Sequence, residues 1–260
     1  IEVDEGDTVT FAATTIDGDD LPDLLTAAWV SDVDGALDST APDPTGAIGF
    51  EATSLSIGLH TVTLTVADLD GETADDTVLV EINGAPGAPT ISIDPSAPGS
   101  HEDLNAVIDV DAVDPDGDTL TYSYAWYEGT TLMTGYTTAL VPASATARAD
   151  VWTVEVTAFD GRVSGPTGTA SATIGNGVPS VDSAGIAPDP VYTDGSLALT
   201  ATGSDPDPGD TATLTYEWFI GTTSTGQTGT SLDGATWFDK ADVVTCVVTA
   251  SDGTDSATLT

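Results

Sequence analysis

Two short acidic loops hold the side chains whose types and spacing point most directly to chemistry. Their aspartates are Asp114, Asp116 and Asp118 in the sequence DPDGD, and Asp205, Asp207 and Asp210 in the sequence DPDPGD. Each loop runs into an alternating stretch that ends at a tryptophan. Carboxylates crowded in this way destabilise a fold by mutual repulsion unless a cation neutralises them. The loops therefore predict sites for a bound cation.

Calcium is the cation that these loops favour, because it accepts oxygen ligands in flexible geometry whereas magnesium requires a strict octahedron. Zinc, copper and iron prefer nitrogen or sulfur ligands, and His60, His101 and Cys246 are scattered along the chain. The spacing does not match an EF-hand, whose glycine and final carboxylate would fall on Thr119 and Ala125. An alternative stays open: aspartate, glycine and proline form good turns without any metal.

The loops belong to an internal repeat. Aligning Trp126 with Trp218 gives an offset of 92 residues. The same offset places the segment DVWTVEVTAFDG (150–161) over DVVTCVVTASDG (242–253). Upstream the offset is 91, because the second acidic loop is one residue longer. A length change in a loop between fixed segments is typical of a folded repeat.

A third, more divergent copy precedes these two. Its tryptophan is Trp29, its acidic loop is DGDD (17–20), and its closing run is HTVTLTVADLDG (60–71). Short turn-forming linkers, NGAPGAP (83–89) and NGVP (176–179), separate the copies. The sequence thus predicts three domains, with a truncated last strand in the third, at residues 1–83, 84–176 and 177–260.

Each copy shows the two-residue period of β-strands. In the closing runs the side chains predicted to face inward are Val62, Leu64 and Val66; Trp152, Val154 and Val156; and Val244, Cys246 and Val248. In the earlier strands they are Val9, Phe11 and Ala13; Ala106, Ile108 and Val110; and Leu197, Leu199 and Ala201. Copies of about 90 residues with a central tryptophan predict an all-β fold of three tandem immunoglobulin-like β-sandwiches.

In such a sandwich, the loop before the tryptophan strand and the loop after the closing run lie at the same end. We therefore expect each acidic loop to meet the aspartate of the following Asp-Gly pair. The predicted calcium ligands are Asp17, Asp19, Asp20 and Asp70 in the first repeat, Asp114, Asp116, Asp118 and Asp160 in the second, and Asp205, Asp207, Asp210 and Asp252 in the third. Linker carbonyls near Asn83 or Asn176 would complete the coordination.

The first repeat resembles the polycystic-kidney-disease (PKD) type of domain, through VDEGDTVTF (3–11) and GLHTVTLTVADLDGETADDTVLVEI (58–82). The other two resemble bacterial immunoglobulin-like or cadherin-like repeats, with DPDGDTLTYSYAW as the most recognisable stretch. The resemblance implies extracellular, non-catalytic modules of prokaryotic surface proteins. The first repeat departs from the pattern, since 41 positions separate Trp29 from Asp70 against 34 in the other two.

Other residues are interpreted more simply. Trp29, Trp126 and Trp218 are expected in the core, and Trp237 at the surface. The tyrosines are expected to pack across strands rather than to form a sugar-binding strip, although glycan contact stays open; they are Tyr122, Tyr124, Tyr127 and Tyr136. We expect His60 at the edge of a strand and His101 in a polar loop, neither with a serine or cysteine partner at a recognisable spacing. We therefore expect no enzyme.

The composition supports an extracellular setting. The chain has 43 acidic and 3 basic residues, giving a net charge of −40, which argues against nucleic acid as a partner. Its single cysteine is expected to be buried, and no apolar stretch is long enough to span a membrane. The chain starts in mid-pattern without methionine, which we interpret as a segment of a longer protein.

These observations predict a calcium-stiffened spacer of a surface protein, whose partners are the neighbouring domains of the same chain. Two alternatives stay open: a self-assembling filament or surface-layer subunit that contacts other copies of itself, and a carbohydrate-binding accessory module of a secreted hydrolase.

Overall fold

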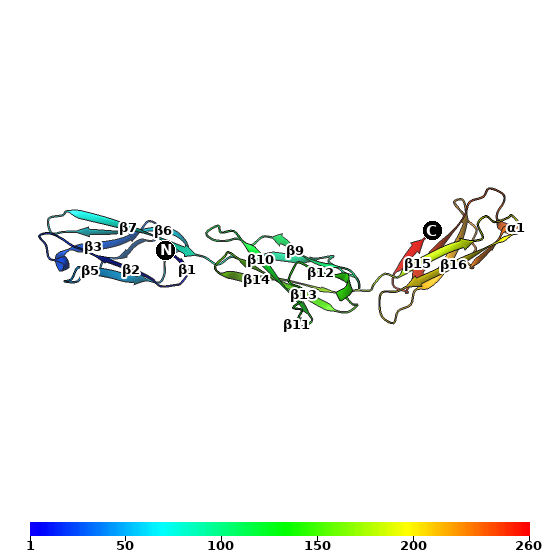
Figure 1. Cartoon of the computed structure of the whole chain (residues 1–260), viewed down its shortest axis with the longest axis horizontal. Helices are drawn as coiled ribbons and strands as arrows, with labels where there is room; N and C mark the ends of the chain where they lie inside the picture. Colours follow the sequence, from blue (N-terminus) through cyan, green and yellow to red (C-terminus); the bar gives the residue numbers. More distant parts are fainter. The chain divides into compact units, whose positions relative to one another are not determined.

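The structure is a computed structural model that describes all 260 residues. It is almost entirely β-strand, with one short α-helix, α1 (Gly234–Trp237), and two 3₁₀ turns, η1 (Pro22–Leu24) and η2 (Ala143–Ala145) (Figure 1). No helix has the length and apolar character that crossing a membrane requires. The strands pair into sheets within each of the three repeats, which confirms the predicted all-β fold of tandem β-sandwiches.

The chain divides into two compact units. The first comprises Ile1–Thr90, Ile108–Ser123 and Val156–Gly168; the second comprises Ile91–Val107, Tyr124–Glu155 and Thr169–Thr260. The division passes through the second repeat, so that its acidic loop belongs to the first unit. The three-domain bounds at 83/84 and 176/177 stay a prediction.

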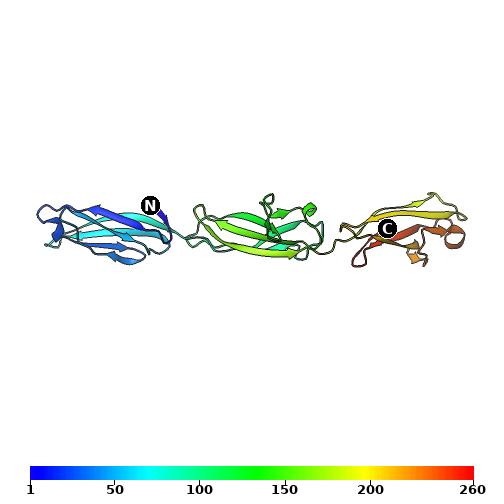
Figure 2. The ribbon, with the colours of Figure 1, turned by 90° about the horizontal axis from the view of Figure 1, so that it is seen from below.

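The first repeat, drawn in blue and cyan in Figure 2, forms two sheets. The larger sheet has the order β1 (Glu2–Asp4), β7 (Thr73–Asn83), β6 (Gly58–Ala67), β3 (Thr26–Ser31) and β4 (Gly35–Asp38); the smaller pairs β2 (Val9–Thr14) with β5 (Ala47–Ala52). β1 runs parallel to β7, and the pairs β2–β5, β3–β4, β3–β6 and β6–β7 are antiparallel. The strand order is that of an immunoglobulin-like sandwich.

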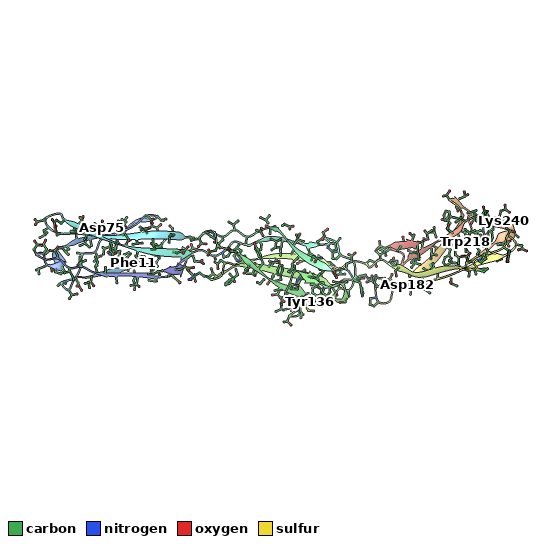
Figure 3. All side chains as sticks on the ribbon, turned by 45° about the horizontal axis from the view of Figure 1, so that its top comes forward. Phe11, Asp75, Tyr136, Asp182, Trp218 and Lys240 are labelled. Atoms are coloured by element: carbon green, nitrogen blue, oxygen red, sulfur yellow. The ribbon has the colours of Figure 1, made fainter.

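The core of the first repeat is aromatic and lies between these sheets. Phe11, labelled in Figure 3, stacks on Phe50 with ring centroids 4.9 Å apart, and both rings contact Trp29. Val62 and Leu64 of β6 are buried against them, while Thr61 and Thr63 between them are not. The predicted alternation of this strand is therefore confirmed.

The second repeat also has two sheets. One has the order β11 (Thr131–Leu132), β10 (Thr121–Glu128), β13 (Val151–Phe159) and β14 (Ser164–Thr173); the other has the order β12 (Leu140–Val141), β9 (Leu104–Val110) and β8 (Thr90–Asp94). Trp126 and Trp152 are fully buried and meet edge to face, with ring centroids 6.3 Å apart. Trp126 Nε1 donates a hydrogen bond to the carbonyl oxygen of Thr138 at 2.9 Å.

The third repeat also has two sheets. One has the order β15 (Ser180–Ala187), β16 (Ser196–Ser204) and β19 (Ser231–Asp233). The other has the order β18 (Thr223–Ser224), β17 (Thr213–Ile220), β20 (Val244–Ser251) and β21 (Ser256–Leu259). Trp218 pairs with Cys246 across β17 and β20, and both are buried as predicted. Trp218 Nε1 bonds the carbonyl oxygen of Gly229, which repeats the arrangement at Trp126. The three central tryptophans are thus core residues.

One strand prediction is wrong at its end. Val110 is 60% exposed, although the two-residue period places it on the inner face with Ala106. It is the last residue of β9, where the chain leaves the sheet for the acidic loop. Trp237, in α1, remains 36% exposed, in line with its position outside the repeat pattern.

Candidate metal centre

The first acidic cluster, which we define as Asp114, Asp116 and Asp118, lies in the loop between β9 and β10. Its members each bring a carboxylate oxygen to within 4.8 Å of the others. One oxygen of Asp114, Oδ1, accepts the N–H groups of three following residues at 3.0 to 3.2 Å. These bonds wind the loop around Asp114, which explains how a short DPDGD segment folds its carboxylates inward.

Two oxygens of this cluster are buried without a hydrogen-bond partner. They are Asp114 Oδ2 and Asp116 Oδ1. The other oxygen of Asp116, Oδ2, accepts the N–H of Gly84 in the preceding linker at 2.9 Å. Each carboxylate is therefore held through one oxygen while the other is left free to act as a ligand.

The second acidic cluster, Asp205, Asp207 and Asp210, repeats this arrangement between β16 and β17. Its carboxylate oxygens also lie within 4.8 Å of one another. Asp205 Oδ1 accepts the N–H of Asp207 at 2.8 Å, and Asp207 Oδ2 accepts the N–H of Gly177 in the linker at 2.9 Å. Asp205 Oδ2 and Asp207 Oδ1 are buried and unpartnered, and only 3% of Asp207 is exposed.

The buried oxygens without a partner occupy matching positions in the two clusters, two in each. A buried carboxylate oxygen without a donor is costly, and such groups in native proteins require an explanation. A hard cation with oxygen ligands supplies one, since each cluster brings three carboxylates together. The residues present thus fit a calcium ion chemically.

Two carboxyls of the first cluster, Asp114 and Asp116, differ in pKa. The neighbouring carboxyl of Asp114, followed by burial, raises the pKa of Asp116 above its usual range. Burial also raises the pKa of Asp114, but its hydrogen bonds outweigh this effect and leave that pKa lowered. The two neighbouring carboxyls therefore have pKa values shifted in opposite directions.

Asp160 and Asp252, predicted as calcium ligands, are not members of these two clusters and bind the linker asparagines. Asp160 Oδ1 accepts the N–H groups of Arg162 and Val163 at 2.6 and 2.7 Å, and its Oδ2 accepts Asn83 Nδ2 at 3.1 Å. Asp252 makes the same three contacts, with Thr254, Asp255 and Asn176. Both oxygens of each carboxylate are therefore already engaged with donors.

The two asparagines were missed as side-chain partners, because the sequence suggested only a role for linker carbonyls. Asn83 is 1% exposed, and the next residue, Gly84, binds the first acidic cluster. Consecutive linker residues thus bind the two loops separately, one through a side chain and one through a backbone N–H. The signal was present in the sequence, since the dipeptide Asn-Gly begins both linkers.

In the first repeat the two loops that hold the predicted ligands are in contact. Asp17 Oδ1 accepts the N–H groups of Asp19 and Asp20, Asp20 Oδ2 accepts the N–H of Leu69 at 3.2 Å, and Asp70 is exposed. No three carboxylates of this loop gather as they do in the two clusters. The calcium prediction for Asp17, Asp19, Asp20 and Asp70 has no comparable geometry behind it.

The two arginines of the chain contact different acidic groups. Arg162 Nε lies 2.9 Å from Asp4 Oδ1 and 3.3 Å from Glu2 Oε1. Arg148 Nη1 bonds Asp210 Oδ2, lies 3.5 Å from Asp207 Oδ2, and donates to Asn176 Oδ1 at 3.0 Å. Only Arg148 therefore contacts an acidic cluster.

His60 differs from its prediction. It is fully buried in β6, which has β7 and β3 on its two sides, and its Nδ1 lies 2.8 Å from Ser31 Oγ. Nε2 faces the carbonyl oxygen of Ser56 at 2.6 Å and must donate, so Nδ1 accepts the serine proton. Ser31 Oγ also accepts the N–H groups of Val33 and Asp34, which makes this buried pair a turn-closing contact.

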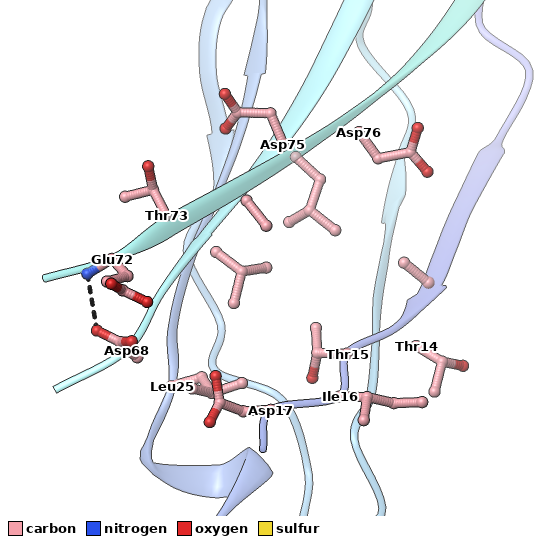
Figure 4. A pocket seen from close by; sticks show the side chains of 14 residues that line it. Thr14, Thr15, Ile16, Asp17, Leu25, Asp68, Glu72, Thr73, Asp75 and Asp76 are labelled. Carbon is pink, nitrogen blue, oxygen red and sulfur yellow. Dashed lines mark hydrogen bonds between the residues drawn. The ribbon is translucent and has the colours of Figure 1, made fainter. Parts of the chain in front are cut away.

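A pocket of about 370 Å³ opens in the first repeat between β2 and β7 (Figure 4). Its acidic lining residues are Asp17, Asp68, Glu72, Asp75 and Asp76. β2 pairs only with β5, whereas its counterparts β9 and β16 each have two neighbours, which explains the opening. The floor is apolar, formed by Leu25, Leu64 and Val66.

Three of the four tyrosines that were expected to pack across strands make contacts within the protein. Tyr122 hydroxyl accepts the N–H of Ala112 at 3.0 Å, and Tyr127 hydroxyl bonds Glu155 at 3.2 Å. Tyr136, labelled in Figure 3, meets the edge of Trp152 with ring centroids 5.8 Å apart. These contacts agree with the interpretation of packing.

No family model matches the chain, and no curated protein matches it. Solved structures do. One described as "Structural insight into host cell surface retention of a 1.5-MDa bacterial ice-binding adhesin" is 16% identical, covers 99% of this chain and 90% of its own, and has a TM-score of 0.39. The fibronectin(III)-like modules of Clostridium thermocellum CbhA are 13% identical. The match covers 67% of this chain and 88% of theirs, with a TM-score of 0.29.

The immunoglobulin domains 1–5 of Sidekick-1 are 13% identical, cover 99% of this chain and 55% of theirs, and have a TM-score of 0.37. At these identities and TM-scores the similarities carry no argument about function.

Proposed function

We propose that this segment is a non-catalytic spacer of an extracellular surface protein, and that calcium bound at the two acidic clusters stiffens the connections between its repeats. The observation that carries the proposal is the pair of buried, unpartnered carboxylate oxygens in each cluster, next to an aspartate that binds the preceding linker. An ion at either cluster would tie the linker to the loop.

The ligands come from this chain's own loops. Asp114 Oδ2 and Asp116 Oδ1, with the Asp118 carboxylate, would hold the ion in the first cluster; Asp205 Oδ2, Asp207 Oδ1 and Asp210 would do so in the second. The ion supplies positive charge that relieves the repulsion among the carboxylates. The linker glycines then keep their bonds to Asp116 and Asp207, so bending at the linkers is restricted.

The net charge of −40 supports the same environment. A chain that repels itself this strongly is stabilised by screening salt or bound divalent cations. The outside of a cell provides calcium at concentrations that suit loop sites of modest affinity.

Calorimetric unfolding in excess calcium and in excess chelator, at matched ionic strength, tests the proposal. Each site should add about 2.7 kcal/mol when free calcium is about 100-fold above its dissociation constant, and the unfolding temperature should rise by several degrees. Magnesium at the same concentration should produce a smaller rise, which separates binding from screening.

Variants locate the effect. Asp116→Asn and Asp207→Asn should each remove part of the calcium-dependent rise, because each replaces a ligand oxygen by an amide of the same shape. Asp70→Asn makes the same substitution at an exposed carboxylate. It is the matched control and should keep the full rise in unfolding temperature. Indistinguishable curves in calcium and chelator would refute the calcium sites and leave the aspartates as turn residues.

A further inference from the structure

The two acidic clusters differ in one contact that the repeat pattern does not show. Arg148 Nη1 bonds Asp210 Oδ2 and lies 3.5 Å from Asp207 Oδ2, so its charge sits directly against two of the three carboxylates of the second cluster. The same nitrogen donates to Asn176 Oδ1, and Asn176 Nδ2 donates to Asp252 at 2.7 Å and to Asp255 at 2.9 Å. Arg148 thereby connects the cluster to the linker asparagine.

The first cluster has no such cation. The repeat alignment that places the segment 60–71 over 150–161 puts Gly58 at the position of Arg148. Next to Gly84, the space that a side chain would fill is bounded by Ile57 and Pro115, which are apolar. The other arginine of the chain, Arg162, pairs with Glu2 and Asp4 instead.

We infer that Arg148 is an internal cation of the second cluster that competes with a divalent ion for the same carboxylates. The inference rests on the proposed function and adds an order of binding to it. Asp207 is nearly inaccessible to solvent whereas Arg148 is 44% exposed, so solvent screens the attraction between them only in part. A calcium ion entering there must displace or repel the guanidinium, whereas one entering the first cluster meets no positive charge.

Two consequences follow. The first cluster binds calcium more tightly than the second, by about tenfold for one additional positive charge near the ion. Without calcium, the second cluster has Arg148 as an additional attachment to its linker, whereas the first linker is held by the contacts of Asp116 and Asp160 alone. The two linkers then respond to calcium over different concentration ranges.

The test is calorimetric calcium titration of chains in which only one cluster remains. Asp207→Asn leaves the first cluster intact and Asp116→Asn leaves the second, so their affinities can be compared directly without altering Arg148. We expect the Asp207→Asn chain to bind calcium about tenfold more tightly than the Asp116→Asn chain. Adding Arg148→Gln to the Asp116→Asn chain should remove most of this difference.

Controls separate charge from structure. Arg162→Gln removes the other arginine, which does not touch a cluster, and should change neither affinity. Arg148→Lys, which keeps the charge, should stay close to the weaker affinity. In chelator, Arg148→Gln should lower the unfolding temperature of the Asp116→Asn chain, since the second cluster then has no cation.

Equal affinities in the two single-cluster chains, or an Arg148→Gln chain that binds no more tightly, would overturn this inference while leaving the calcium sites standing. Absence of binding in both chains and in the unaltered protein would overturn the proposed function, and this inference with it.

Discussion

The acidic loop of the first repeat and the first acidic cluster have nearly the same composition but different structures. Residues 17–20 read DGDD and residues 114–118 read DPDGD. In the first repeat, Asp17 and Asp20 accept backbone N–H groups within the same sandwich. In the cluster, Asp116 accepts the N–H of a linker glycine from the preceding segment, and two oxygens stay buried and free.

The difference shows that closely spaced aspartates alone do not produce buried, unpartnered carboxylate oxygens in this protein. In both clusters a linker glycine donates its N–H to an aspartate, a contact that the acidic loop of the first repeat does not make. Burial leaves the other oxygen of that aspartate without a hydrogen-bond partner. Substitutions at the linker contacts, paired with the same substitutions in the first repeat, measure how much this difference contributes to stability and to calcium binding.

The largest effect is expected for Asp160→Ala. The change leaves the N–H groups of Arg162 and Val163 and the buried amide of Asn83 without an acceptor. Loss of charged hydrogen bonds at a buried site costs about 2 to 3 kcal/mol of unfolding free energy. Urea unfolding in chelator, followed by tryptophan fluorescence, measures it.

Asp70→Ala is the matched control, because Asp70 precedes the corresponding glycine of the first repeat and is exposed. It should leave the unfolding midpoint nearly unchanged. Equal losses in the two variants would show that the linker contact of Asp160 contributes nothing, and that the comparison between the loops has no energetic basis.

Much of the fold could be predicted from residue types alone. Alternation of valine and threonine in 60–71 and 150–161 indicates both the strands and their inner faces, because a β-strand exposes one face and buries the other. The same rule fails at Val110, since the period continues past the last residue that the sheet covers. Periodicity says which face a residue takes but not where the opposing layer ends.

The site was predictable only in part. The acidic loops were found because their carboxylates are dense and repeated. The roles of Asn83, Asn176 and Arg148 were not found, since they depend on contacts between residues 28 to 77 positions apart. Asp160 and Asp252 illustrate the limit: the turn that follows each aspartate directs N–H groups onto it, which the sequence spacing does not reveal.

An intermediate effect is expected for Gly177→Ala. A Cβ at this position would collide with Ser100 Oγ and with the ring of Pro206. The linker would have to move away from Asp207, which loses the N–H bond to Asp207 Oδ2 and costs about 1 to 3 kcal/mol from overpacking. Calcium affinity at the second cluster should fall as well, because the linker no longer covers the carboxylates.

Gly18→Ala makes the same change in the acidic loop of the first repeat, where a Cβ meets nothing within 4 Å. Its unfolding temperature and its calcium response should match those of the unaltered chain. Thermal unfolding with and without calcium compares the two alanine variants, and a Gly177→Ala chain as stable as the Gly18→Ala chain would show that close linker contact is unnecessary.

The smallest effect is the pH dependence that Asp252 contributes. The Asn176 amide, followed by the N–H groups of Asp255 and Thr254, lowers the pKa of Asp252 below the ordinary 3.8. The unfolded chain therefore takes up a proton at higher pH than the folded chain does. The stabilisation is fully present above pH 3.8 and is lost as the pH falls through the lower pKa of the folded state.

Asp252→Asn removes this titration, so its thermal stability in chelator should decline less steeply than that of the unaltered chain as the pH is lowered below 4. Asp70→Asn, at the corresponding exposed position, should leave the slope unchanged. If both variants followed the unaltered chain across this range, the contact between Asp252 and Asn176 would not persist in solution. The linker would then be held by its glycine alone, which would weaken the distinction between the clusters and the loop of the first repeat.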